Sequence, residues 1–254
     1  MGCFGTINGS KYNTSKVGVE EEHTGQQYDG EKVLAKLNQE VRLQFVRKVF
    51  GIVTIQLLLT FSICLISTIE PLATSLRSYW YLMFFPFTIA MIIYCYLVCH
   101  QKLARTHPHN IVSLFVFTLF FGAFLGMVSA FYTTMVIVFA ILFTVAASFG
   151  LILFATQTRV DFTSNFAYLY IVLWVGIGFG WVYPLSAGQY LDQLIYSAII
   201  GIIFSCYLVH HTQMIIGGKH RYQFVIDDYV FAALSLYMDI AQIFLAILAF
   251  GSQR

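Results

Sequence analysis

Charged residues are scarce in this chain. Aspartate, glutamate, lysine and arginine make up 10% of its 254 residues, whereas hydrophobic residues make up 59%. Because a soluble domain carries about 25% charged residues, the composition excludes a soluble globular protein and indicates an integral membrane protein whose main partner is the lipid bilayer. The net charge of +2, without a sustained basic and aromatic surface, excludes nucleic acid as a partner.

Signatures of metal sites and of enzymes are also missing. The chain has five cysteines, most of them inside apolar stretches, and none lies in a CxxC zinc pattern or an extracellular cysteine framework. It has no GxSxG elbow, no HExxH motif and no Walker loop. We therefore expect packed thiols, no catalytic site, no enzyme activity and no resident cofactor.

Long, continuous apolar runs dominate the rest of the chain. They do not alternate with polar residues as membrane-spanning strands do, and a helix needs about 20 apolar residues to cross a bilayer. The connections between them are too short to hold a soluble domain. The sequence therefore predicts an all-α, multi-pass bundle of seven transmembrane helices within residues 49–250. The predicted spans are 49–69, 79–99, 111–131, 135–155, 166–184, 194–216 and 229–250.

The N-terminal segment has a different composition. Residues 1–30 are polar and predict a disordered cytosolic tail without a cleaved signal peptide. Apolar residues at helical spacing over residues 31–48 predict an amphipathic helix on the cytosolic membrane surface. The first residues fit a myristoylation pattern at Gly2, with a palmitoylation candidate at Cys3.

Basic residues predict the orientation. Twelve of the 14 lysines and arginines fall on one side of the predicted spans, and only Arg77 and Arg254 fall on the other. Because basic residues accumulate on the cytosolic side, we expect a cytosolic N-terminus. Seven spans place the C-terminus across the membrane, whereas a re-entrant last segment would return it to the cytosol.

Asp239 lies about ten residues into the last apolar stretch. A carboxylate near mid-membrane costs a few kcal/mol and usually faces a bundle interior, an ion path or a proton site. Ser235, Asp239 and Gln242 share one helical face, so the stripe is expected to face inward. The alternative is a structural role, in which Asp239 only accepts hydrogen bonds between helices.

Other polar residues gather near the predicted cytosolic side. His210 is expected to mark the membrane interface, and His211 either marks it too or forms a titratable partner for Asp239. Asp227 and Asp228 precede the last span, where acidic residues stabilise a helix N-terminus. A role in cytosolic ion entry is their alternative. Counting residues places His211 about one helical turn nearer the surface than Asp239.

Several motifs together resemble one known family. They are VRKVFG at 46–51, QLLLT at 56–60, DFTS at 161–164, TQMI at 212–215 and DDYVFAALSLYMDI at 227–240. The chain is similar to the Bax-inhibitor-motif family, in its lifeguard and glutamate-receptor-associated branch. The similarity covers residues 40–250, and the last motif is the most specific.

The resemblance implies seven helices with the last one enclosed by the others. It also implies a pH-gated calcium leak across an endoplasmic reticulum, Golgi or plasma membrane, with calcium ions, protons and apoptosis-regulating membrane proteins as partners. Asp239 matches the aspartate of the last span, which in the family shares a proton with an aspartate on span six. In this sequence His211 stands at that second position.

The histidine alters the expected chemistry. Calcium prefers several oxygen ligands, so Asp239 with an imidazole is a poorer metal site than two carboxylates, and we expect weak, transient calcium binding and altered gating. Arg47 is expected to anchor the first helix on the cytosolic side. The alternatives are a non-conducting scaffold that regulates apoptosis or stress signalling through partners, and a proton-coupled transporter.

Overall fold

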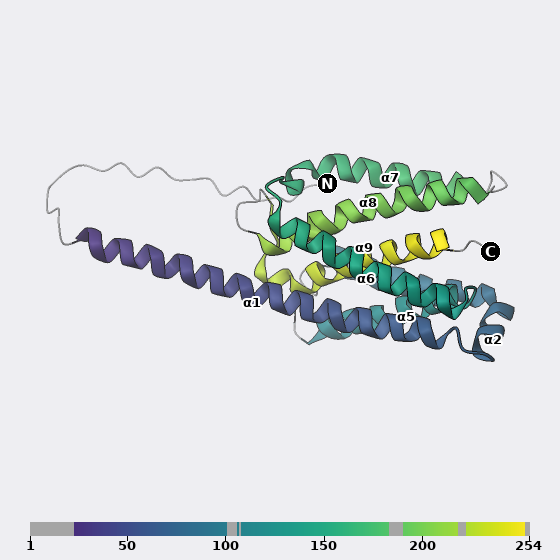
Figure 1. The fold of residues 1–254 in the computed structure, drawn as a ribbon. Helices are drawn as coiled ribbons and strands as arrows, with labels where there is room; N and C mark the ends of the chain where they lie inside the picture. Colours follow the sequence, from purple (N-terminus) through teal and green to yellow (C-terminus); the bar gives the residue numbers. More distant parts are fainter. Residues whose placement is uncertain (1–22, 101–105, 107, 183–189, 218–221, 252–254) are drawn as a thin grey trace. The chain divides into compact units, whose positions relative to one another are not determined.

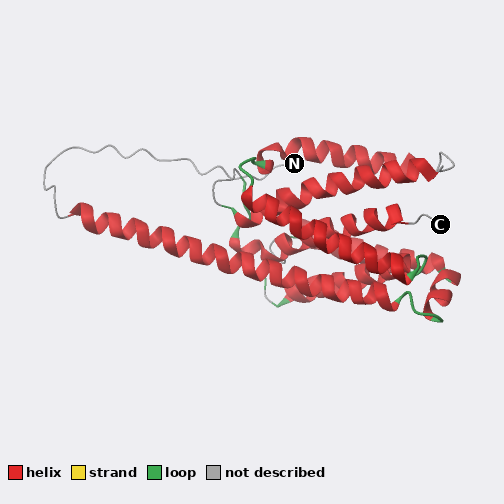
Figure 2. Cartoon of the chain, viewed as in Figure 1, coloured by secondary structure: helices red, strands yellow, loops and turns green. Residues whose placement is uncertain are grey.

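The structure is a computed structural model that describes residues 23–100, 106, 108–182, 190–217 and 222–251. Every regular element in these ranges is a helix, which confirms the all-α prediction (Figure 2). The elements are α1 (His23–Ile66), α2 (Leu72–Ser78), η1 (Trp80–Met83), α3 (Phe84–Cys99), α5 (His109–Ser129), α6 (Thr134–Gln157), η2 (Phe162–Asn165), α7 (Phe166–Val182), α8 (Tyr190–Ile216), η4 (Ile226–Asp228) and α9 (Tyr229–Gly251).

The predicted division of the N-terminal segment differs from the structure. The described residues divide into two units, with the boundary between Val41 and Arg42. Helix α1 is continuous from His23 to Ile66, so residues 23–30 are helical and the predicted surface helix and first span are one element. No proline interrupts this stretch, and therefore nothing ends the helix where the composition changes. Residues 1–22, with Gly2 and Cys3, lie outside the described residues.

The other predicted spans coincide with helices of the second unit. Among the described residues, six helices are long and apolar enough to cross a membrane. Helix α7, at the fifth predicted span, contributes a shorter apolar stretch, Ala167–Gly176. The count of seven spans is therefore approximate, whereas the multi-pass architecture is confirmed.

Helix α9 is the central helix of the second unit. In its most apolar window 67% of the residues are buried, against 17–39% in the other five candidate spans. It packs against α5, α6 and α8 (Figure 1), and its Phe244 ring lies 5.5 Å from the Phe61 ring of α1. The central position of the last helix, expected from the family resemblance, is confirmed.

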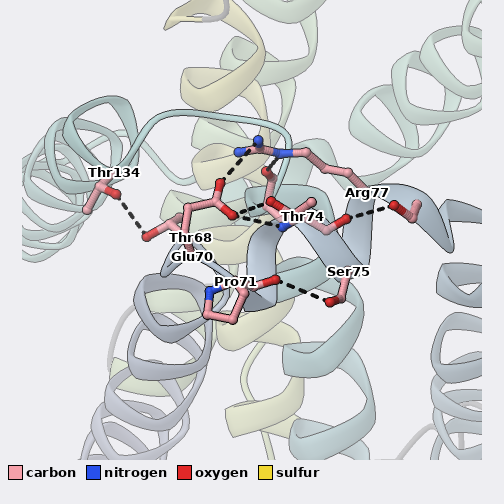
Figure 3. A network of polar contacts seen from close by, with 9 residues as sticks. Thr68, Glu70, Pro71, Thr74, Ser75, Arg77 and Thr134 are labelled. Atoms are coloured by element: carbon pink, nitrogen blue, oxygen red, sulfur yellow. Dashed lines mark hydrogen bonds and ion pairs between the residues drawn. The ribbon is translucent and has the colours of Figure 1, made fainter.

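The turn after α1 carries a polar network that ties several helix ends together (Figure 3). Arg77 of α2 donates from Nε to the carbonyl of Ala130, which follows α5, over 2.5 Å. The same guanidinium lies 3.4 Å from the Glu70 carboxylate. Thr134, the first residue of α6, donates its hydroxyl to that of Thr68 over 3.1 Å. We call this end of the bundle the Arg77 end and the opposite one, where α8 ends and α9 begins, the Arg42 end.

Candidate functional site

Two side chains that the sequence placed at different depths meet inside the bundle. Nδ1 of His211 on α8 lies 2.6 Å from Oδ2 of Asp239 on α9. The Asp239 side chain is 4% exposed and that of His211 is 17% exposed. The contact is short for an N–H···O hydrogen bond, as is typical of charge-assisted bonds. The structure therefore places His211 directly beside the carboxylate.

The direction of the helices explains how the two side chains meet. Helices α8 and α9 pack side by side and run antiparallel, because α9 begins at the end where α8 stops (Figure 1). Side chains of a helix lean toward its N-terminus, so His211 leans away from the Arg42 end while Asp239 leans toward it. The two leans close the gap of about one turn that counting residues predicts.

Aromatic and ionisable groups surround this pair. The ring centroids of Tyr207 and Phe224 lie 5.7 Å and 6.4 Å from that of His211. Tyr207 is buried, and its hydroxyl has no hydrogen-bond partner among the described residues. Tyr94 of α3 and Tyr207 both lie within electrostatic range of Asp239. A buried phenol hydroxyl of this kind is usually paired with an ordered water.

His210 is buried beneath the connection between α6 and α7. It is 1% exposed, and its Nδ1 lies 3.2 Å from the carbonyl of Phe162 in the α6–α7 connection. Gln213 secures the same connection, because it donates to the Val160 carbonyl and accepts from the Phe162 N–H, both over 2.8 Å. The sequence did not indicate this cover, because the loop has no apolar periodicity that would place it against α8.

The predicted polar stripe on α9 is only partly a site. Ser235 is half-buried and donates its hydroxyl to the Phe231 carbonyl of its own helix. Gln242 is also half-buried, and no hydrogen bond to it is recorded in the described ranges. Of the three, Asp239 alone bonds to another helix. Asp227 is exposed in η4, directly before α9, beside the half-buried Asp228, which suits acidic residues at a helix N-terminus.

The anchor of α1 is Arg42 and not Arg47. Arg47 is exposed, whereas the half-buried Arg42 donates three hydrogen bonds to backbone carbonyls at the α8–α9 junction. Its acceptors are Met214 over 2.6 Å, Phe224 over 2.7 Å and Ile216 over 3.2 Å. No sequence pattern could identify this contact directly, because every residue carries a carbonyl. The sequence indicates only that the last carbonyls of a helix need donors from outside the helix, and not which residue supplies them.

The donor set limits the chemistry of the site. No group of three or more His, Cys, Asp or Glu side chains that could hold a metal occurs in the part of the chain that the structure describes. Calcium takes six to eight oxygen ligands, and the pair supplies one carboxylate and an imidazole. The arrangement can exchange a proton and can attract a passing cation when the carboxylate is unpaired.

Comparison with known proteins places this geometry in a family. The profile described as "Inhibitor of apoptosis-promoting Bax1" matches residues 42–254. The chain is 33% identical over 222 residues to "Protein lifeguard 3" of Homo sapiens, covering 85% of this chain and 71% of that protein. The identity to "Protein lifeguard 3" of Mus musculus is 32% over 221 residues, with the same coverage. "Protein LIFEGUARD 3" of Arabidopsis thaliana is 32% identical over 222 residues, 83% of this chain and 85% of that protein. The profile covers most of the chain and includes both His211 and Asp239, and the chain belongs to the Bax-inhibitor family of membrane proteins, with lifeguard proteins as its relatives.

Proposed function

We propose that this protein is a pH-sensitive calcium leak channel that supports calcium homeostasis and inhibits cell death. The observation that carries the proposal is the 2.6 Å contact between His211 and Asp239 inside the membrane bundle. A structural hydrogen bond alone does not require a carboxylate there, because a serine or an asparagine makes one at lower cost. The proposed membrane is the endoplasmic reticulum, the Golgi or the plasma membrane, with the Arg42 end cytosolic.

The sign of the pH dependence follows from the charges of the pair. When His211 is protonated and Asp239 is ionised, the site is neutral overall and the charge-assisted bond holds α8 against α9. When His211 loses its proton, the site carries one negative charge, the bond weakens, and a cation can replace the lost positive charge. We therefore expect the leak to increase when a rise in pH removes the proton from His211.

Few other groups titrate near the pair. From α8, His210 and Tyr207 face the same region, and from α3 Tyr94 does. Tyr170 of α7 interacts with Tyr207. Helix α6, which packs against both α8 and α9, has no titratable side chain. The described residues near the pair thus offer few titratable groups besides the two histidines.

Calcium efflux from liposomes that contain purified protein tests the proposal. We expect the wild-type flux to rise with pH and Asp239→Asn to abolish the pH dependence. Glu40→Gln, which removes an exposed carboxylate from α1, serves as the matched control and should behave as wild type. Absence of flux from correctly folded wild-type protein would contradict the leak and favour the non-conducting scaffold.

A second variant tests the role of the histidine. His211→Asp places two carboxylates in contact, and such a pair shares a proton because both cannot ionise cheaply. We expect a changed pH profile and tighter calcium binding. An unchanged profile would show that His211 does not control the leak. In cells, Asp239→Asn should also remove any protection from calcium-dependent death, which is measured as survival after store overload.

A further inference from the structure

At the C-terminus of α8, backbone carbonyls bind the guanidinium of Arg42. The last four carbonyls of a helix have no partner within the helix. Arg42 supplies donors to two of the carbonyls at this end, those of Met214 and Ile216, and a third donor to Phe224 beyond it. Its positive charge lies at the negative end of the helix dipole. The planar fork of the guanidinium carries its donors on three separate nitrogens, whereas an ammonium group gathers its three donors on one nitrogen.

A glycine leaves room for the guanidinium. Gly217 has φ of +69°, the left-handed conformation that ends many helices, and its N–H donates to the Gln213 carbonyl over 2.9 Å. A Cβ at this position would lie 2.8 Å from Nη2 of Arg42. The backbone of Phe224 also returns to α8, because its N–H donates to the Met214 carbonyl over 3.0 Å.

This junction is coupled to the His211–Asp239 pair by direct contacts. Met214, whose carbonyl accepts from Arg42, lies three residues after His211 and so on the same side of α8. The ring of Phe224 is stacked on the imidazole of His211, with centroids 6.4 Å apart. The same ring packs edge-to-face on Phe231 in the first turns of α9. Arg42 thus fixes the backbone of the last turn of α8, which follows the histidine, and that of Phe224, whose ring lies against the imidazole.

We infer that Arg42 is the positioning residue of the pair: by holding the α8–α9 junction against α1, it keeps His211 within hydrogen-bond distance of Asp239. The inference rests on the proposed function for its role in the leak, but the positioning itself is a property of the fold. Without the three hydrogen bonds of Arg42, the last turn of α8 and the Phe224 backbone are free to move. His211 then loses its fixed distance to the carboxylate.

A double-mutant cycle measures this positioning without any ion flux. His211→Gln, Asp239→Asn and their combination give the coupling between the two side chains from unfolding in mixed micelles. We expect a coupling of about tenfold in the unfolding equilibrium constant in wild-type protein. In the Arg42→Met background the coupling should fall below about twofold. Arg47→Met is the matched control, because Arg47 is exposed on the same helix, and it should leave the coupling at its wild-type value.

A spectroscopic signature separates positioning from a general loss of stability. The short His211–Asp239 bond should give a strongly deshielded imidazole N–H proton in NMR spectra of the protein in nanodiscs, assigned by its loss in His211→Gln. We expect the signal to disappear in Arg42→Met and to persist in Arg47→Met. If Arg42→Met does not fold, Arg42→Lys is used, which keeps the charge but not the fork, and it should weaken both the signal and the coupling.

The outcomes distinguish this inference from the proposed function. Wild-type coupling and signal in folded Arg42→Met would overturn the positioning role, and so would an absence of coupling in the wild-type chain. Lost coupling in Arg42→Met together with no calcium flux from wild type would support the positioning role and overturn the leak. A pH-dependent wild-type flux that Arg42→Met leaves unchanged would overturn the role of Arg42 in the leak.

Discussion

The hydroxyl of Tyr237 lies 2.8 Å from that of Thr60, on the side of α9 that faces away from Asp239. Tyr237 and Asp239 are two positions apart on the helix and therefore point to nearly opposite sides. Both hydroxyl-bearing residues are buried. Helix α9 thus bonds to α8 through one face and to α1 through the other.

The Tyr237–Thr60 bond should show an asymmetric response to mutation. Thr60→Val strands the Tyr237 hydroxyl in the core and should lower the free energy of unfolding by about 2–3 kcal/mol. Tyr237→Phe should cost only about 1 kcal/mol, because the Thr60 hydroxyl can turn to a carbonyl of its own helix. Denaturant unfolding in micelles measures both. The double variant should be more stable than Thr60→Val alone, and the reverse order would contradict the bond.

Gly217 should not tolerate a side chain. Gly217→Ala places a Cβ 2.6 Å from Oε1 of Gln223 and 2.8 Å from Nη2 of Arg42. The left-handed backbone adds roughly 1–2 kcal/mol for an L-residue, so we expect at least that loss of stability. Gly51→Ala is the control: nothing lies within 4 Å of its Cβ, and alanine in a helix interior should stabilise the protein by about 0.5–1 kcal/mol. Equal effects of both substitutions on the melting temperature would contradict the geometry.

Glu70 should make the Arg77 end sensitive to acid. The hydroxyl of Thr74, with a smaller contribution from the Arg77 charge, lowers the pKa of the Glu70 carboxyl below its ordinary value of 4.5. A lowered folded-state pKa stabilises the protein above the ordinary value, and this stabilisation is lost as the pH falls through the folded-state pKa.

The difference in melting temperature between wild type and Glu70→Gln should therefore be present at neutral pH and vanish below the ordinary range of glutamate. Because Glu70 and Arg77 are both largely exposed, the difference is expected to be small. Thr74→Val should flatten the acid dependence as well. A difference that persists unchanged in acid would show that the carboxylate charge is not involved.

The protein should be destabilised when the amide nitrogen of Gln213 is replaced by an oxygen. Gln213 is fully buried and uses both ends of its amide on the α6–α7 connection. Gln213→Glu keeps the acceptor for Phe162 but turns a buried charge toward the Val160 carbonyl, so it should destabilise the protein by about 3 kcal/mol or more.

Hydrogen exchange of residues 158–165 measures this change directly. Exchange should accelerate strongly in Gln213→Glu and less in Gln213→Met, which strands two backbone groups without adding a charge. Gln44→Glu, on the exposed side of α1, should stay within about 0.5 kcal/mol of wild type. Equal protection in Gln213→Glu and wild type would contradict the two hydrogen bonds.

The sequence predicted the membrane helices well for a simple physical reason. Continuous apolar runs allow only a helix or a closed barrel in lipid, so the run from 229 to 250 became α9 almost residue for residue. Asp239 was identifiable for the complementary reason, because a carboxylate is costly in such a run. The sequence predicted a boundary at residue 48 that the structure does not have, because a change of composition does not end a helix.

The contacts of the site were less predictable. Residue counting gave the depth of His211 and Asp239 along their helices but not the lean of their side chains, and only the antiparallel packing brings them within 2.6 Å. The role of Arg42 depends on backbone acceptors, which carry no sequence signal. The burial of His210 was not predicted, because the loop that covers it could not be placed from composition.

The central position of α9 sets an order of events during synthesis. Asp239 follows His211 by 28 positions in the chain. At a synthesis rate of roughly 5–20 residues per second, the aspartate leaves the ribosome a few seconds after the histidine. Thr60 precedes Tyr237 by 177 residues, so it waits roughly ten to thirty seconds for its partner. The polar groups of the earlier helices that pair with α9, such as those of Thr60 and His211, therefore enter the bilayer before their partners.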